Sequence, residues 1–482
     1  MAEKSSLLVR TKVAYGVGST AEAAIAIVFN SFNFLFYNNV LGLSGTLCGL
    51  AVTIAMVFDA ISDPLVGSLS DRWRSRLGRR HPFLYAAPIP MGFFFVCIYS
   101  PPAGLEQIGL FAWFTVNTVL LRTALTLYHV PHLALGAEMT LDYHERSVLM
   151  SYNTIFGLLG TAGVSYLSWS YLGSLEGGTS NRLGYLVVAS VVACFGIVMV
   201  FASAFFTRDQ IAKLSRPPTD LPAFSLTELL AEVRVCLSNK NYQMLIFGML
   251  FLSATIGLHE TLNAHINLFY WELDEAQIGL MALGAPPGLL IATLMTPRLH
   301  VRFGKRETLI AGILGIALAV GLPVTLRLFG WFTENGSSLH FPILCALKMI
   351  SYGSGAVMVI SIVSSLADVT DEHELLTGRR QEGVFFAARS FFSKLTSGLG
   401  HLLAGIAIDV ISFPVGAQPG EVDPDTLFDF GIVAGPLTVL PALISLLFYV
   451  RYRIDQPRHQ QIRRELERRS VELEASMPMQ GN

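Results

Sequence analysis

Twelve long apolar stretches run along this 482-residue chain, and they constrain its fold more than any other feature. A helix that crosses a membrane needs about 20 mostly apolar residues. The stretches lie at 13–37, 45–69, 83–100, 107–136, 148–172, 185–207, 242–270, 277–297, 308–328, 341–366, 384–412 and 429–450. Charged residues make up only 14% of the chain, whereas a soluble domain carries about 25%. The sequence therefore predicts an all-α membrane protein with twelve transmembrane helices.

A polar stretch at 208–240 divides the twelve segments into two sets of six. The loop sequence Gly78-Arg79-Arg80, after the second segment, reappears as Gly304-Lys305-Arg306 after the eighth. Two six-helix halves in parallel repeat are typical of the major facilitator fold. We therefore predict an N-terminal half at 1–207, a cytosolic connector at 208–240, a C-terminal half at 241–452 and a cytosolic tail at 453–482. The tail is expected to form a solvated helix.

Basic residues are concentrated in alternate loops, which predicts the orientation of the chain. The basic loops contain Arg72, Arg74, Arg76, Arg79, Arg80, Arg146, Arg298, Arg302, Lys305, Arg306, Arg379 and Arg380. The alternate loops near 38–45, 101–106, 271–276 and 413–428 contain no Lys or Arg. Because twelve crossings return the chain to the side where it starts, both termini are expected in the cytoplasm of a cell whose membrane the protein spans.

The second segment carries the sharpest candidate site, Asp59 and Asp63 followed by Pro64. Residues four apart lie on one face of a helix, and a proline frees a backbone carbonyl in the preceding turn. Two carboxylates with spare oxygens suit a hard monovalent metal cation, or they share one proton because their repulsion raises one pKa. The alternative is a pair neutralised for packing alone, by Lys394 or Arg122.

Other polar side chains in the apolar segments are candidates for contact with a solute, because a charge at mid-membrane costs at least about 2.5–3.5 kcal/mol. The candidates are Glu22, Arg122, His129, Tyr152, His259 and Glu260. His259 and His265 are six residues apart and do not form the zinc motif of proteases, which needs a spacing of four. We expect these two to face a polar cavity or a helix interface, and Arg122 to pair with an acid.

Several classes of function are excluded by composition. The five cysteines include no CxxC pair, so no disulfide framework or zinc site is legible. We find no nucleophile–base pair or phosphate-binding loop and therefore expect no enzyme. The net charge of -2 argues against a nucleic-acid partner. We expect no cofactor beyond a coupling cation, and a monomer that contacts the lipid bilayer, a cation and a small solute.

Nearly the whole chain resembles the glycoside–pentoside–hexuronide:cation symporter family. The resemblance is carried by Tyr15-Gly16-x-Gly18, the Asp59-Asp63-Pro64 element, Thr140-Leu141-Asp142 with Glu145-Arg146, Ala367-Asp368-Val369 with Asp371, and Lys394. It implies that Asp59 and Asp63 bind the cation, with Thr126 as a further oxygen donor. It also implies that Lys394 couples the two halves.

The loop from Gly67 to Arg80 resembles the signature GxxxDRxxxRxGRR of the major facilitator superfamily. That likeness implies a gating network of charges at the cytoplasmic face, with ordinary positive-inside charge as the alternative reading. The gating candidates are Asp71, Arg72, Arg79, Arg80, Asp368 and Arg379.

The sugar site of the melibiose-transporting members does not carry over. Ala23, His129, Leu133 and Thr154 stand where those members have aspartate, aspartate, tryptophan and arginine. The expected function is therefore cation-coupled (Na⁺ or H⁺) symport of a glycoside-like or other small organic solute.

Two alternatives to this function remain. The first is symport of an amphiphile, because segments of the chain are similar to the sodium-dependent lysophosphatidylcholine symporters. These segments are 63–67, 129–131 and 391–394. The second, of another class, is an uncoupled facilitator or channel.

Overall fold

The structure, a computed structural model, describes residues 7–140, 142–214, 234–379 and 381–476. Twelve helices in these ranges are long and apolar enough to cross a membrane, which confirms the predicted number. The first six spans are α1 (Val9–Phe34) with η1 (Leu35–Val40), α2 (Gly45–Arg72), α3 (His81–Ala86) with α4 (Pro88–Ile98), α5 (Gln107–Glu138), α6 (Tyr143–Gly173) and α7 (Arg182–Phe206). Short 3₁₀ turns, η2 (Gly178–Ser180) and η3 (Arg208–Lys213), flank α7.

The second six spans follow residues 215–233. These residues make up most of the predicted connector and lie outside the described part of the chain. The six spans are α9 (Lys240–His265) with η4 (Ile266–Tyr270), α10 (Glu275–Ala282) with α11 (Ala285–Phe303), α12 (Lys305–Ile316) with η5 (Ala317–Gly321) and α13 (Leu322–Leu328), α14 (His340–Thr377), α15 (Glu382–Val410), and α16 (Pro424–Ile432) with η6 (Val433–Leu437) and α17 (Thr438–Tyr449). A last helix, α18 (Gln456–Ser476), lies outside the spans.

Hydropathy did not predict the π-helical segments η1, η4, η5 and η6. Apolar composition is the same for i→i+4 and i→i+5 bonding, so it cannot distinguish the two. Pro436 lies inside η6, where a proline removes one backbone donor. The tenth span also differs from its predicted end at 366, because α14 continues to Thr377 and buries Asp368 and His373 beyond the apolar stretch.

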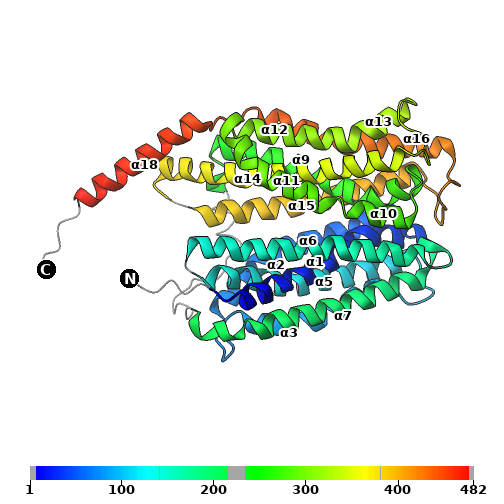
Figure 1. Ribbon diagram of the computed structural model, residues 1–482, viewed down its shortest axis with the longest axis horizontal. Helices are drawn as coiled ribbons and strands as arrows, with labels where there is room; N and C mark the ends of the chain where they lie inside the picture. Colours follow the sequence, from blue (N-terminus) through cyan, green and yellow to red (C-terminus); the bar gives the residue numbers. More distant parts are fainter. Residues whose placement is uncertain (1–6, 141, 215–233, 380, 477–482) are drawn as a thin grey trace.

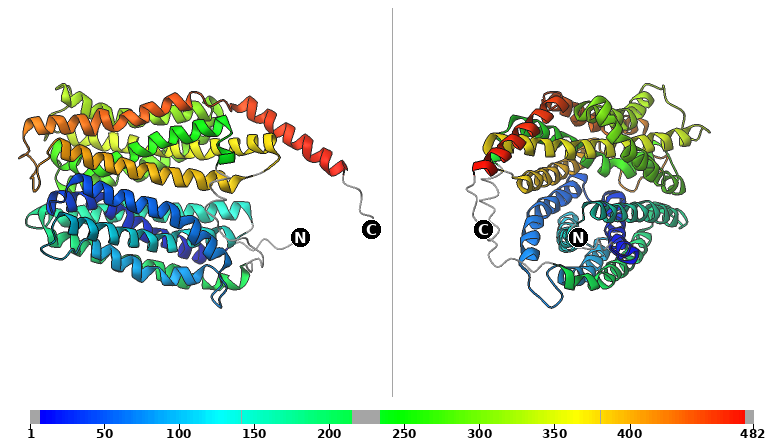
Figure 2. Two further views of the ribbon diagram at one scale, coloured as in Figure 1. Left: turned by 180° about the vertical axis from the view of Figure 1, so that it is seen from behind. Right: turned by 60° about the vertical axis from the view of Figure 1, so that its left-hand side comes forward.

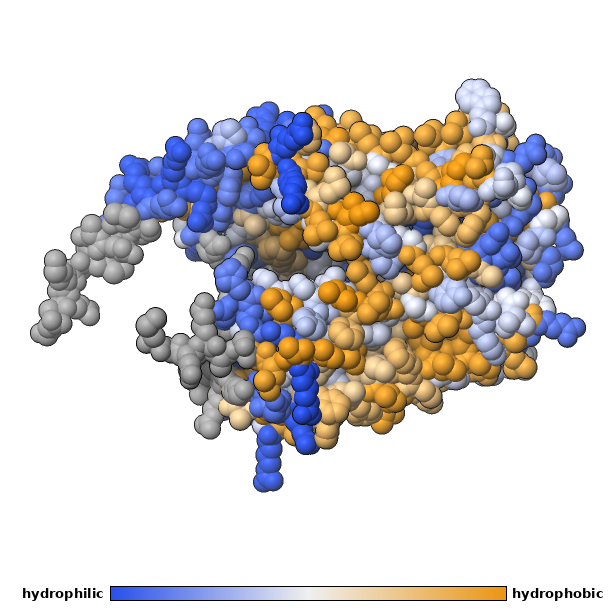
Figure 3. All heavy atoms as spheres, in the orientation of Figure 1, coloured by the Kyte–Doolittle hydropathy of each residue, from blue (hydrophilic) through white to orange (hydrophobic). Residues whose placement is uncertain are grey.

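The spans form two bundles that lie side by side, α1–α7 in one and α9–α17 in the other (Figures 1 and 2). They meet mainly along α2 and α15, and also where α6 packs against α10. The surface is apolar over the middle of the bundle and hydrophilic toward its two ends (Figure 3). The chain begins and ends at the same end, which we call the termini end. At that end the surface is hollowed between the two bundles (Figure 3). The opposite end is called the far end.

The tail helix departs from the expectation of a fully solvated helix. It forms at Gln456–Ser476, but Ile462 is fully buried and Arg469 donates to the Leu375 carbonyl of α14 at 2.7 Å. One apolar residue on a mainly polar helix is enough to dock it, which the i, i+4 pairing of Glu465 with Arg469 did not reveal.

Candidate functional site

Asp59 and Asp63 lie on the face of α2 that is turned toward α5 and α15. The Thr126 hydroxyl of α5 lies 2.9 Å from Asp59 Oδ1 and 3.0 Å from Asp63 Oδ1. The Asp59 side chain is 8% exposed and that of Asp63 is 24% exposed. Three oxygen-bearing side chains from two helices therefore converge in the membrane-spanning region.

Two cationic side chains balance this pair of acids. Lys394 Nζ, from α15 in the other bundle, lies 2.8 Å from Asp59 Oδ2 and also donates to Asp63 Oδ2. Arg122 Nη1 of α5 lies 3.8 Å from Asp59 Oδ2, as expected for a partner of an acid. The lysine thus connects the two bundles through the acids of the first. We call Asp59, Asp63, Thr126 and Lys394 the central cluster.

A second polar pair joins α1 to α5 in the N-terminal bundle. His129 Nδ1 lies 2.7 Å from Glu22 Oε1, and both side chains are partly exposed, at 39% and 30%. Tyr152 of α6 is half-buried. In the described structure its hydroxyl makes no hydrogen bond, while its backbone carbonyl packs against Gly16 of α1. The pair and Tyr152 are therefore not one hydrogen-bonded group.

The polar candidates of α9 separate into two places. Glu260 Oε2 lies 3.9 Å from His401 Nε2 of α15, and the Thr261 hydroxyl lies 2.6 Å from His401 Nδ1. His259 instead lines a cavity of about 50 Å³ inside the C-terminal bundle, together with Lys348.

Lys348 and His265 show how buried polar residues of this bundle are accommodated. Lys348 donates to Asn263 at 2.9 Å rather than snorkelling to the surface. His265 is fully buried among Phe34, Phe269 and Phe413, so it lies at a helix interface. Among the described residues no group of three His, Cys, Asp or Glu side chains could hold a metal ion.

Charged residues form a network at the termini end of the N-terminal bundle. Arg80 is buried, contacts Asp71, and donates to Glu138 Oε1 at 2.9 Å and to the Ser70 hydroxyl at 2.6 Å. Arg79 Nη2 lies 3.0 Å from Glu138 Oε1. Glu138, the last residue of α5, was missed because its partners lie some 60 residues away along the chain.

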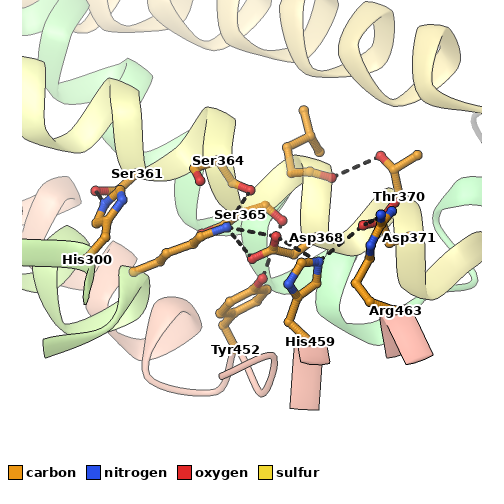
Figure 4. Close-up of polar contacts among 12 residues, drawn as sticks. His300, Ser361, Ser364, Ser365, Asp368, Thr370, Asp371, Tyr452, His459 and Arg463 are labelled. Carbon is orange, nitrogen blue, oxygen red and sulfur yellow. Dashed lines mark hydrogen bonds and ion pairs between the residues drawn. The ribbon is translucent and has the colours of Figure 1, made fainter. Parts of the chain in front are cut away.

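A matching network surrounds Asp368 in the C-terminal bundle (Figure 4). Lys305 Nζ lies 2.7 Å from Asp368 Oδ2. His459 of α18 lies 3.3 Å from Asp368 and 3.1 Å from Asp371, and Figure 4 shows its ring between the two acids. Arg463 Nη1 approaches Asp371 at 3.9 Å. The Gly-Lys-Arg repeat and α14 thus place acid–base contacts at corresponding places in both halves.

Two gating candidates stand outside these networks. Arg72 ends α2 and Arg379 is exposed after α14, and within the described ranges neither side chain has a hydrogen-bond or ion-pair partner. Arg380, next to Arg379, lies outside the described residues.

Comparisons with known proteins agree with this architecture. Residues 14–456 match the family model described as MFS/sugar transport protein. The putative glycoside/cation symporter YagG of Escherichia coli (strain K12) is 24% identical, over 96% of this chain and 95% of its own. Sodium-dependent lysophosphatidylcholine symporter 1 of Mus musculus is 23% identical, over 98% of this chain and 91% of its own.

Among solved structures, the inward-open conformation of the xylose transporter XylE from E. coli superimposes with a TM-score of 0.61 and 14% identity, covering 92% of this chain and 96% of that one. At this identity the likeness concerns the fold.

Proposed function

Because the chain belongs to the family of MFS/sugar transport proteins, whose members are transporters and not enzymes, we propose that it is a cation-coupled symporter. It moves a small organic solute by alternating access, in which two rigid halves rock around a central site. The observation that carries the proposal is the central cluster, which joins both halves at one group of charges.

The cation site consists of the carboxylates of Asp59 and Asp63 and the hydroxyl of Thr126. All three supply oxygen, which hard cations prefer, and the hydroxyl bridges the two acids. The coupling cation is Na⁺ or H⁺. A sodium ion would bind all three oxygens, whereas a proton would be shared between the carboxylates.

Lys394 links cation binding to movement of the halves. Its ammonium occupies the place where a cation would meet Asp59 and Asp63. Asp59 and Asp63 already face two positive side chains, Lys394 and Arg122. A bound cation adds a further positive charge, so it weakens the attraction between the carboxylates and Lys394. Withdrawal of Lys394 then releases the C-terminal half from α2. The cation shifts the equilibrium only by its differential affinity for the two arrangements.

The solute binds between the halves, near Glu22, Arg122, His129, Tyr152 and Glu260, whereas His259 lines the separate cavity inside the C-terminal bundle. The partly exposed Glu22–His129 pair supplies a charged acceptor and a donor for hydroxyl groups. A glycoside-like solute fits this chemistry. YagG, named a putative glycoside/cation symporter, supports the same class.

An amphiphile is the second candidate solute. The chain matches a lysophosphatidylcholine symporter over 98% of its length, and Leu133 is 38% exposed where sugar-transporting relatives have a stacking ring. An apolar wall beside a charged pair suits a solute with one polar head. The remaining alternative is an uncoupled facilitator. Such a protein binds no coupling cation and therefore would not need the central cluster.

The charge networks at the termini end act as gates in this scheme, and the basic loops support a cytoplasmic location of that end. Arg80 with Asp71 and Glu138, and Lys305 with Asp368, hold the ends of helices within each half. They would exchange partners when the halves close there. The domain limits 1–207, 208–240, 241–452 and 453–482 follow the same division.

Uptake by the purified protein in proteoliposomes tests the proposal. A panel of glycosides and a lysophospholipid is offered under an imposed Na⁺ gradient, an imposed H⁺ gradient, or none. Symport predicts that one solute accumulates above its external concentration under only one of the gradients. Equilibration without accumulation under every gradient would instead identify a facilitator.

A further inference from the structure

Asp409 makes three hydrogen bonds across the boundary between the halves, at the far end. It lies one residue before the end of α15 and faces the start of α2. Its carboxylate accepts from the Ser44 hydroxyl at 2.6 Å, from the Gly45 N–H at 2.7 Å and from the Thr46 N–H at 2.8 Å. A residue of the C-terminal half thus caps the first turn of a helix in the N-terminal half.

The start of α2 is suited to bind a carboxylate. The first backbone N–H groups of a helix have no partner within the helix, and the helix dipole favours negative charge there. Ser44 is the N-cap residue and accepts from Leu47 N at 3.4 Å, which leaves the Gly45 and Thr46 N–H groups for Asp409. The Asp409 side chain is also exposed to solvent, so water can replace it, as a reversible contact requires.

Glycines let the two helices approach closely next to this cap. A Cβ atom added to Gly405 of α15 would lie 2.0 Å from the Gly45 carbonyl oxygen, and one added to Gly49 would lie 2.5 Å from the His401 carbonyl oxygen. Small residues permit such backbone contact between membrane helices. The cap therefore depends on the two helix backbones touching, and it is lost if they separate.

The cap and the central cluster lie on the same two helices at matching intervals. Fifteen residues separate Ser44 from Asp59 on α2, and fifteen separate Lys394 from Asp409 on the antiparallel α15. Each interval spans about 22 Å of helix. The pair is thus held at its middle by Lys394 and at its far end by Asp409.

Further contacts between the halves surround the cap. Gly416 N donates to the Asn39 carbonyl at 3.0 Å, and Gln418 donates to the Ser180 hydroxyl at 2.8 Å. The Thr179 N–H donates to Glu275 Oε1 at 3.1 Å. The far end is therefore joined by several contacts, and the one at Asp409 binds the start of a membrane-spanning helix.

We propose that Asp409 is the latch of the far-side gate. Its carboxylate holds the start of α2 against α15 while the termini end is open, and its release is a step in opening the far side. The inference rests on the proposed alternating-access function and adds a positioning residue to it. Loss of the latch should shift the molecule toward far-side opening, whatever solute or cation it carries.

Thiol labelling tests this proposal. Thr53 is buried on α2 between the cap and the central cluster, where its hydroxyl donates to the Gly398 carbonyl of α15 at 2.6 Å. A single cysteine is introduced as Thr53→Cys in a chain whose five natural cysteines are replaced. An impermeant thiol reagent added outside intact cells reaches it only when the far side opens. Asp409→Ala should speed labelling about tenfold, since hydrogen bonds to a charged group are lost.

Asp423→Ala is the matched control. Asp423 also caps a helix at the far end, accepting from Asp425 N at 3.1 Å and Thr426 N at 3.4 Å, but that helix belongs to its own half. This control should label as slowly as the parent. Equal labelling of the Asp409→Ala variant and the parent, or equal acceleration by both substitutions, would overturn the latch.

A second variant acts in the opposite direction and keeps the test independent of folding. Ser44→Cys with Asp409→Cys, oxidised to a disulfide, should block labelling at position 53, and reduction should restore it. Labelling that continues in the oxidised protein would contradict the proposal. Neither measurement uses a solute or an ion gradient, so its failure is distinct from failure of the proposed symport.

Discussion

Lys394 Nζ lies 2.8 Å from Asp59 Oδ2, and the two residues belong to different halves of the molecule. Each half alone would hold a poorly compensated charge in the membrane region. An unpaired charge at this depth is costly, so the contact favours association of the halves. A cation that competes for the same carboxylates therefore changes how firmly the halves are tied.

Replacing Lys394 should make stability depend on the coupling cation. In Lys394→Met the two carboxylates lose a partner, and we expect a loss of about 1–3 kcal/mol, below the value for a fully buried pair because the site is partly hydrated. The coupling cation should restore part of the lost stability, because it binds the folded state. Thermal unfolding of the purified variant with and without Na⁺, and over a range of pH, measures this. Lys394→Arg, which keeps the charge, should depend less on the cation.

His129 should matter for solute affinity rather than for folding. Removing the ring in His129→Ala leaves Glu22 without its 2.7 Å partner, and we expect KM to rise about tenfold because a hydrogen bond involving a charge is lost. Thr154→Ala is the control, since that hydroxyl donates only to its own helix, to Met150 at 3.0 Å. Uptake kinetics compare the two. An unchanged KM in His129→Ala would remove this residue from the solute site.

The buried Arg80 should stabilise the termini end of the N-terminal half. Arg80→Ala leaves Asp71 and Glu138 without their shared partner. We expect a loss of about 2–4 kcal/mol, less than for a fully buried pair, because the Asp71 side chain is 46% exposed. Arg74 is exposed on the same loop, and Arg74→Ala should change stability little. Thermal unfolding in detergent gives both values. Similar melting temperatures for the two variants would contradict the assignment.

Docking of α18 should depend on Ile462. A charge at this fully buried position, in Ile462→Asp, should detach the helix and expose it to protease. Arg464→Asp alters an exposed neighbour on the same helix and should not. Limited proteolysis of the two variants tests the contact, and equal cleavage rates would show that burial of Ile462 does not hold the helix.

The orientation can be checked with two exposed serines. Ser238 lies just before α9 at the termini end, and Ser338 lies between α13 and α14 at the far end. In a cysteine-free background, Ser338→Cys should react with an impermeant reagent outside intact cells and Ser238→Cys should not. The reverse pattern would place the termini outside.

The fold was predictable because hydropathy and charge are local properties of the chain. Each of the twelve apolar segments can be recognised by itself, and the described part of the chain contains twelve helices of membrane-spanning length. The side-by-side placement of Asp59 and Asp63 was equally legible, since it follows from a spacing of four on one helix. The π-helical segments could not be predicted, because they differ from α-helix in backbone hydrogen bonding and not in side-chain hydropathy.

Contacts between helices that lie far apart along the chain could not be predicted from the sequence. Spacing could not tell which helix of the second half faces α2. Lys394 was therefore one of two possible neutralising partners, and its coupling role came only from the family resemblance. Glu138 and Asp409 lie in the last turns of α5 and α15, and His459 lies in the first turn of α18, where a polar residue normally faces solvent. Their partners lie far along the chain, and only the fold brings them together.

The most direct test of the central cluster compares Asp59→Asn and Asp63→Asn with the parent in proteoliposomes. Each variant loses a carboxylate ligand, whereas removing a charge from the membrane favours insertion. We predict that the parent accumulates its solute under the cation gradient, whereas both variants only let it equilibrate. Full accumulation by both variants would contradict the cation site and, with it, the proposed coupling through Lys394.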